Sequence, residues 1–224
     1  MGSTANGRTT QGAGRGRIWD LPTRLFHWSL AALVAFSFVT AKVGGAWTQW
    51  HFYSGYSILT LLLFRLLWGF AGSLYARFAT FVRGPRAITA QLRSDPYAAG
   101  HSPLAGLSVL AMLLALLVQA GTGLFASDDI ASEGPLLRLV SQATGALLTR
   151  IHRWNEMVLI ALVTLHFAAA LYYLLIRRRN LIVPMFTGDQ PVHGRPAEDD
   201  RATRIRAALL LAVAAALVAY IVNL

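Results

Sequence analysis

The sequence predicts an all-α integral membrane protein whose five transmembrane helices form one bundle. Of its 224 residues, 55% are hydrophobic and only 13% are charged, and the mean hydropathy is +0.50. Such values are typical of chains that reside in a bilayer. Five apolar stretches are each long enough to cross a hydrocarbon core of about 30 Å. Because the links between them are short, we expect one bundle and not several domains.

A polar tail, residues 1–16, precedes the first apolar stretch and is expected to be disordered because Gly, Ser, Thr and Arg dominate it. No small-residue cleavage site follows a short apolar run, so the first span is expected to be an uncleaved anchor. The third span opens with Ser102 as the expected N-cap and Pro103 as the first helical residue. The expected spans are residues 27–46, 51–71, 104–125, 152–176 and 205–222.

Arginine alternates between the two ends of the bundle. The tail, the second link and the fourth link are rich in arginine, whereas the first link has only Lys42 and the third balances its arginines with acidic residues. The positive-inside rule therefore predicts a cytoplasmic N-terminus and a periplasmic C-terminus. The formal net charge of +10 follows from this topology. Membrane lipid is the expected partner, and nucleic acid is not, because the chain has too little polar surface for a basic patch.

Cysteine is absent from the chain. Its absence excludes disulfides, thiolate-bound iron–sulfur clusters and covalently attached c-type haem, and it removes the usual structural zinc sites. A redox centre in this protein would have to be held non-covalently, by histidine or methionine.

Four histidines are placed at two depths of the membrane. His152 and His166 are fourteen residues apart on the fourth span, so they lie within about 40° of one helix face and about 21 Å apart along it. His27 begins the first span at the inner face, at the depth of His166. His51 begins the second span at the outer face, at the depth of His152. Depth alone therefore predicts the pairs His27/His166 and His51/His152.

Two separated imidazole pairs favour two haem groups over a bare metal. Zinc and copper sites gather three or four ligands, whereas these histidines lie two by two at distant levels. Bis-imidazole ligation leaves iron no open position, which favours electron transfer over oxygen chemistry. Histidines near an interface can instead meet headgroups or cap helices, which is the structural alternative. Met112 and Met157 are possible axial ligands, but packing is the preferred role for both.

Further polar residues are expected near the same two levels. Arg65, fourteen residues after His51, reaches the inner level, where its guanidinium either pairs with a haem propionate or extends to headgroups. Arg153 has the same two interpretations at the outer level. His101, at the inner end of the third span, is a possible fifth ligand, but a propionate or structural contact is preferred. The pair Asp128 and Asp129 is either a solvated helix end or an acidic patch that steers a basic redox partner or accepts protons from quinol.

Several motifs together resemble the bacterial cytochrome b561 and nickel-hydrogenase b-type cytochrome family. The similarity extends over residues 17–188 and rests, besides the His152/His166 pair, on the segments Trp19–Trp28, Arg65–Gly69, Ala76–Phe78, Gly100–Leu104 and Asn180–Gly188. The resemblance implies a four-helix transmembrane di-haem bundle with two non-covalent b haems, one between His27 and His166 and one between His51 and His152. Residues 189–224 would then be a loop and an additional, fifth C-terminal transmembrane helix without a candidate ligand.

The resemblance also implies a function in the bacterial inner membrane. We expect transfer of electrons between the quinone pool and a periplasmic redox partner such as a c-type cytochrome. The alternatives are a superoxide:quinone oxidoreductase and the membrane anchor or cytochrome b subunit of a hydrogenase. No residue is predicted to be catalytic, and no compact motif locates a quinone site.

Overall fold

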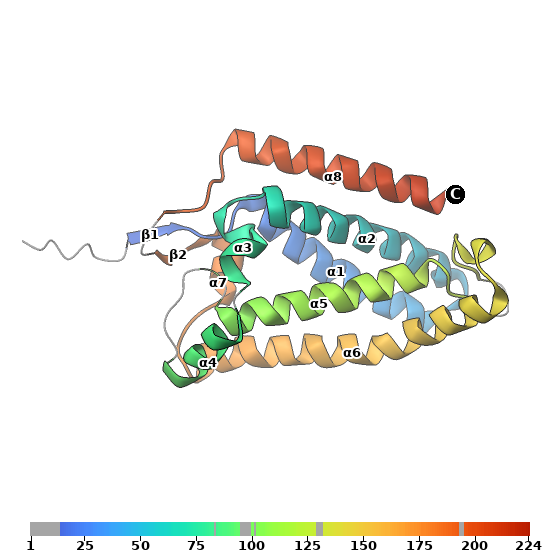
Figure 1. The fold of residues 1–224 in the computed structure, drawn as a ribbon, viewed down its shortest axis with the longest axis horizontal. Coiled ribbons are helices and arrows are strands. Elements are labelled where there is room, and N and C mark those ends of the chain that lie inside the picture. The colour runs from blue at the N-terminus through green and yellow to red at the C-terminus, as the bar shows by residue number, and fades with distance from the viewer. Residues whose placement is uncertain (1–13, 83, 95–99, 101, 129–131, 193–194) are drawn as a thin grey trace, which may run out of the picture.

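The computed structural model describes residues 14–82, 84–94, 100, 102–128, 132–192 and 195–224. Within this part of the chain five helices are long and apolar enough to cross a membrane, and they lie side by side along the long axis of the molecule (Figure 1). This arrangement confirms the expected all-α membrane fold. The five helices are α1 (Leu21–Val43), α2 (Thr48–Ala71), α5 (Pro103–Gly123), α6 (Gln142–Leu175) and α8 (Arg201–Val222).

Short elements cover the two ends of the bundle. The strands β1 (Gly14–Arg17) and β2 (Asp189–Val192) lie at one end, which we call the inner end, and the opposite end is called the outer end (Figure 1). The remaining short helices are α3 (Phe78–Phe81), α4 (Pro85–Ser94), α7 (Ile182–Thr187) and the 3-10 turns Gly45–Trp47, Leu74–Ala76 and Leu137–Leu139.

Two of the expected boundaries were wrong. Helix α6 begins at Gln142 and not at His152, because Ser141 caps it by accepting a hydrogen bond from the backbone N–H of Thr144 at 3.2 Å. His152 therefore lies inside α6. The polar tail was expected to be disordered through residue 16, but residues 14–16 belong to β1, which pairs with β2 in an antiparallel register that places Arg17 opposite Asp189.

The four helices α1, α2, α5 and α6 are joined by three closely packed seams. Helix α1 packs on α2, α2 on α5, and α5 on α6, whereas α1 and α6 are not among the helix pairs that pack closely. Helix α2 is the centre of the bundle, and its residues Leu62, Phe64 and Trp68 are almost fully buried. The hydrophobic window of α6, by contrast, has no buried residue. The bundle is therefore closely packed around α2 and open along the line where α1 faces α6.

Helix α8 packs against the face of α2 that lies away from α6 (Figure 1). Its buried residues Thr203, Ala207, Ala214 and Val218 form a stripe of small side chains, which allows two membrane helices to approach closely. Asp200 caps the helix, and the hydrogen bond from the backbone N–H of Thr203 lowers the pKa of this carboxyl. Helix α8 thus extends the bundle without contributing a histidine.

Candidate functional site: two histidine pairs

The structure brings the four histidines together in the two pairs expected from their depth. At the inner level, the ring centroids of His27 on α1 and His166 on α6 are 6.3 Å apart with an interplanar angle of 50°. At the outer level, the centroids of His51 on α2 and His152 on α6 are also 6.3 Å apart, with an angle of 84°. Both pairs therefore join α6 to the α1–α2 half of the bundle, at two levels of one helix.

The equal separations fit a metal centre between the two rings of each pair. A metal ion bonded at about 2 Å to one nitrogen of each imidazole places the ring centres about 6 Å apart. No group of three or more His, Cys, Asp or Glu side chains occurs among the described residues, so the donor set does not suit a bare ion. It suits a group that supplies its own equatorial ligands, as haem does.

Backbone carbonyls orient both histidines of the outer pair. Nδ1 of His51 lies 2.9 Å from the carbonyl oxygen of Ser37, and Nδ1 of His152 lies 2.9 Å from that of Gln119. A carbonyl oxygen only accepts hydrogen bonds, so both Nδ1 atoms carry the proton and both Nε2 atoms keep a lone pair. This tautomer is the one that histidine uses when Nε2 binds a metal. Sequence reasoning missed Ser37 and Gln119 because a main-chain carbonyl has no residue signature.

Side chains of α5 and α6 complete the polar surroundings of His152. The Gln119 amide nitrogen is 3.3 Å from Nε2 of His152, and its amide oxygen accepts a hydrogen bond from Asn155 at 2.7 Å. The amide nitrogen of Gln119 is therefore placed to donate a hydrogen bond to the lone pair on Nε2. Gly123 lets the ring lie close to α5, because a Cβ there would be 3.0 Å from Cε1 of His152.

An open glycine face adjoins the outer pair. Gly55 follows His51 by one helical turn and shares its face of α2. A Cβ built at Gly55 would meet nothing within 4 Å among the described residues. The described residues therefore leave the α2 face uncovered at Gly55, and no sequence motif indicated this glycine.

Unpaired buried nitrogens mark the inner level. Nδ1 of His27 and Nη1 of Arg65 are buried and have no hydrogen-bond partner among the described residues. Arg65 is only 3% exposed, and its guanidinium lies over the rings of Phe78 and Phe81, 5.0 and 5.9 Å from their centroids. Leaving such a donor unpaired costs about 1–3 kcal/mol, and more for a charged group. The Arg65 side chain therefore suits an anionic group such as a haem propionate.

The other sequence-predicted residues lie elsewhere. Arg153 is exposed, and its guanidinium donates a hydrogen bond to the carbonyl oxygen of Ser127 in the outer loop at 3.4 Å. Asp128 is exposed and accepts a hydrogen bond from the backbone N–H of Ser132, which is the contact of a loop-capping residue. His101 and Asp129 lie outside the described residues.

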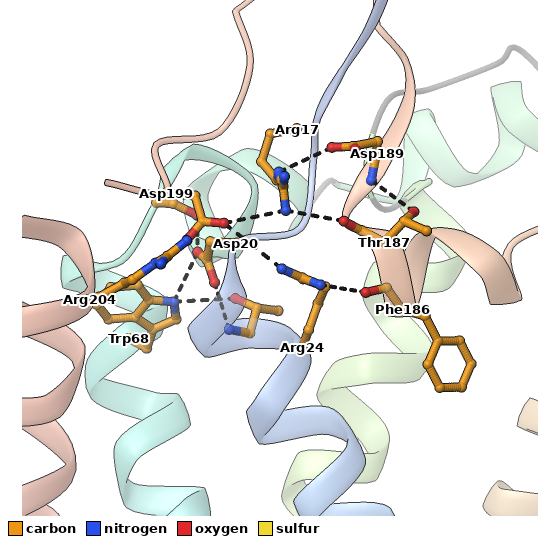
Figure 2. A network of polar contacts seen from close by, with 11 residues as sticks. Arg17, Asp20, Arg24, Trp68, Phe186, Thr187, Asp189, Asp199 and Arg204 are labelled. Carbon is orange, nitrogen blue, oxygen red and sulfur yellow. Dashed lines mark hydrogen bonds and ion pairs between the residues drawn. The ribbon is translucent and has the colours of Figure 1, made fainter. Parts of the chain in front are cut away.

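A buried carboxylate fixes the start of α1. Asp20 is fully buried and caps α1 by accepting a hydrogen bond from the backbone N–H of Thr23 at 2.6 Å. It also accepts hydrogen bonds from the indole N–H of Trp68, at 3.3 Å, and from the hydroxyl of Ser73 (Figure 2 draws the Asp20–Trp68 contact). Asp20 therefore ties the first turn of α1 to the inner end of α2.

Helix α7 holds the next turn of α1 from the other side. The guanidinium of Arg24 donates to the carbonyl oxygen of Phe186, and the indole of Trp28 donates to that of Met185 at 3.0 Å (Figure 2 shows the Arg24 contact). Two segments that are far apart in the sequence thus meet at the inner end of α1.

The comparison with known families agrees with the fold and with the chemistry of the site. The model of the prokaryotic cytochrome b561 family matches residues 18–188, which is most of the chain. No curated protein and no solved structure gives a significant match. The match implies binding of b-type haem, electron transfer and redox partners. The chain belongs to the prokaryotic cytochrome b561 family and is a membrane-embedded b-type cytochrome.

Proposed function

We propose that this protein is a di-haem cytochrome that passes electrons between the quinone pool and a periplasmic redox protein such as a c-type cytochrome. The observation that carries the proposal is the presence of two histidine pairs with the same 6.3 Å ring separation at two levels of α6. The levels are separated by about 21 Å of helix, most of a hydrocarbon core. Two redox centres at these levels would provide a path across the bilayer.

Each side chain of the site has a defined role in this proposal. His27 and His166 hold the inner haem, and His51 and His152 hold the outer one. When bound, haem supplies one-electron iron chemistry, and bis-imidazole ligation reserves it for electron transfer. The carbonyls of Ser37 and Gln119 keep the outer histidines in the ligating tautomer.

The orientation of the bundle determines which partner each level meets. The arginine-rich links connect elements at the inner end, so this end faces the cytoplasm of a bacterial inner membrane. The His51/His152 level then lies near the periplasm, where c-type cytochromes reside. Arg65 serves the inner level as a propionate partner, in agreement with its unpaired Nη1.

Haem quantification combined with single histidine variants tests the proposal. The purified protein should contain two b haems per chain by pyridine haemochrome assay and should titrate as two redox components. His166→Ala should remove the inner component and leave the outer one, and His51→Ala should do the reverse. The matched control His193→Ala changes a histidine far along the sequence from both pairs and should leave two components. One haem per chain, or two unchanged components in His166→Ala, would refute the proposal.

Electron-transfer measurements separate an electron carrier from an enzyme that works without a protein partner. Reduced wild-type protein should transfer electrons to an added c-type cytochrome at a rate that depends on the concentration of that cytochrome. Superoxide alone should reduce added quinone no faster in the presence of the protein than in its absence.

A further inference from the structure

The line along which α1 faces α6 is the one seam of the described four-helix core that close packing leaves open. The other three neighbouring pairs, α1 and α2, α2 and α5, and α5 and α6, all pack closely. The hydrophobic window of α6 has no buried residue, and only 11% of the window of α1 is buried. A hydrophobic carrier dissolved in the bilayer can therefore reach the side chains of α1 and α6 along the α1–α6 seam.

Among the described residues, one ion pair crosses this seam, at its outer end. Nζ of Lys42, near the end of α1, is 2.5 Å from Oε1 of Glu156 on α6. The Lys42 side chain is 56% exposed and that of Glu156 is 29% exposed. Ionisable side chains within a transmembrane helix are costly and usually mark a functional site. The carboxylate is the more enclosed partner, whereas the ammonium is open to the surface.

Glu156 is directed toward the seam beside the outer histidine pair. It follows His152 by four residues, so the two side chains differ by about 40° around α6. Its ion-pair partner is Lys42 from α1, and its charge also acts on His152, as do the charges of His51 from α2 and Arg153 from α6. Helix α5 contributes the neutral Gln119, whose amide oxygen is already bound to Asn155. Glu156 is thus the carboxylate available at this level for a proton.

We propose that Glu156 is the proton acceptor of a quinol site at the outer end of the α1–α6 seam, with Lys42 as its positioning residue. The inference rests on the proposed function and deepens it by locating the quinone chemistry. Oxidation of one quinol to quinone breaks two O–H bonds and releases two protons and two electrons. The two haem groups that the histidine pairs would hold would accept one electron each, and Glu156 would receive the protons in turn and pass them to the outer aqueous phase. In the reverse direction the same carboxylate donates them.

Chemical complementarity favours a quinol over an anionic lipid headgroup at this position. An ionised carboxylate only accepts hydrogen bonds, and a quinol hydroxyl offers the hydrogen that it needs. The ammonium of Lys42 can donate to the second oxygen of the carboxylate or to the carbonyl of the quinone product. A phosphate headgroup would instead compete with Glu156 for Lys42 and leave the carboxylate unpaired.

Stopped-flow reduction by a short-chain quinol tests the assignment. Rates are normalised to the haem that dithionite reduces in the same sample. Glu156→Gln should reduce haem about 100-fold more slowly than wild type, as expected for the loss of a general base. Glu156→Asp retains a carboxylate and should recover much of the rate. The matched control Glu133→Gln, which changes an exposed carboxylate of the outer loop, should behave as wild type.

A photoreactive azidoquinone gives a readout that is independent of turnover. Mass spectrometry should find the label on the outer halves of α1 and α6, and excess quinone should prevent the labelling. A wild-type rate in Glu156→Gln, or labelling confined to the inner end of the bundle, would overturn the assignment. If Glu156→Gln fails to fold, the rate of haem reduction in Glu156→Asp and the position of the label in the wild type test the assignment instead. Absence of haem from the wild type would instead refute the proposed function, and the dithionite spectrum measures the haem content separately.

Discussion

Among the residues that hold the first turns of α1 at the inner end, Asp20 is the one whose replacement by alanine should destabilise the His27/His166 pair most. The carboxylate is fully buried and accepts hydrogen bonds from the backbone of Thr23, the indole of Trp68 and the hydroxyl of Ser73. Loss of the helix cap costs about 1 kcal/mol. Each buried donor left unpaired costs about 1–3 kcal/mol. The indole N–H of Trp68 keeps the hydroxyl of Thr23 as an acceptor at 3.3 Å, so the hydroxyl of Ser73 is the donor that loses its partner. The free energy of unfolding should therefore fall by about 3 kcal/mol, a large share of the 5–15 kcal/mol typical of a folded protein.

Unfolding in detergent, followed by circular dichroism and by the haem absorbance, measures this loss. The proposed inner haem should dissociate first, because His27 lies two turns after Asp20 on α1. Asp20→Asn is the matched variant, since its amide oxygen can keep the helix cap while its NH2 group faces the Trp68 and Ser73 donors. It should lose less stability than Asp20→Ala. A loss below about 1 kcal/mol in Asp20→Ala would refute the reasoning, because it would mean that the buried donors find other partners.

Two further predictions concern the haem levels themselves. Gly55→Leu should cover the open face of α2 beside His51 and remove the proposed outer haem while keeping the inner one, as measured by haem content and redox titration. The control is Gly121→Leu, because Gly121 also lies in open space but on α5. Two retained haems in Gly55→Leu would contradict the prediction. Arg65→Met should lower the midpoint potential of the proposed inner haem, because a nearby positive charge favours the reduced state. Arg65→Lys retains the positive charge and should keep most of the wild-type potential. An unchanged potential in Arg65→Met would show that the guanidinium acts only through packing.

Hydropathy and helical rise were enough to predict the spans and the two histidine levels. Backbone geometry sets the distance from His152 to His166 whatever surrounds the helix, so their depths could be read from spacing. The arginines of the loops then predicted the direction in which each helix crosses the membrane. The start of α6 could not be read in the same way. Its first turns mix polar and apolar residues, and only the cap formed by Ser141 defines the boundary.

The contacts between helices were beyond the reach of sequence patterns. A lipid-facing apolar side chain and a helix-facing one look alike in composition, because hydrocarbon offers little preference between them. The open α1–α6 seam, the Lys42–Glu156 pair and the small-residue face of α8 follow from which helices become neighbours. Hydrogen bonds to backbone carbonyls, such as those of His51 and His152, leave no signature in the residue order.

The amino-acid sequence by itself determined that this chain crosses the membrane as helices and carries imidazoles at two depths. These properties depend on local hydrophobicity and on the fixed geometry of one helix. Only the tertiary structure decided that the imidazoles face each other at 6.3 Å, that Asp20 joins the start of α1 to the inner end of α2, and that Glu156 joins α6 to α1. Those contacts depend on the lateral order of the helices, which steric fit and buried polar pairing select together.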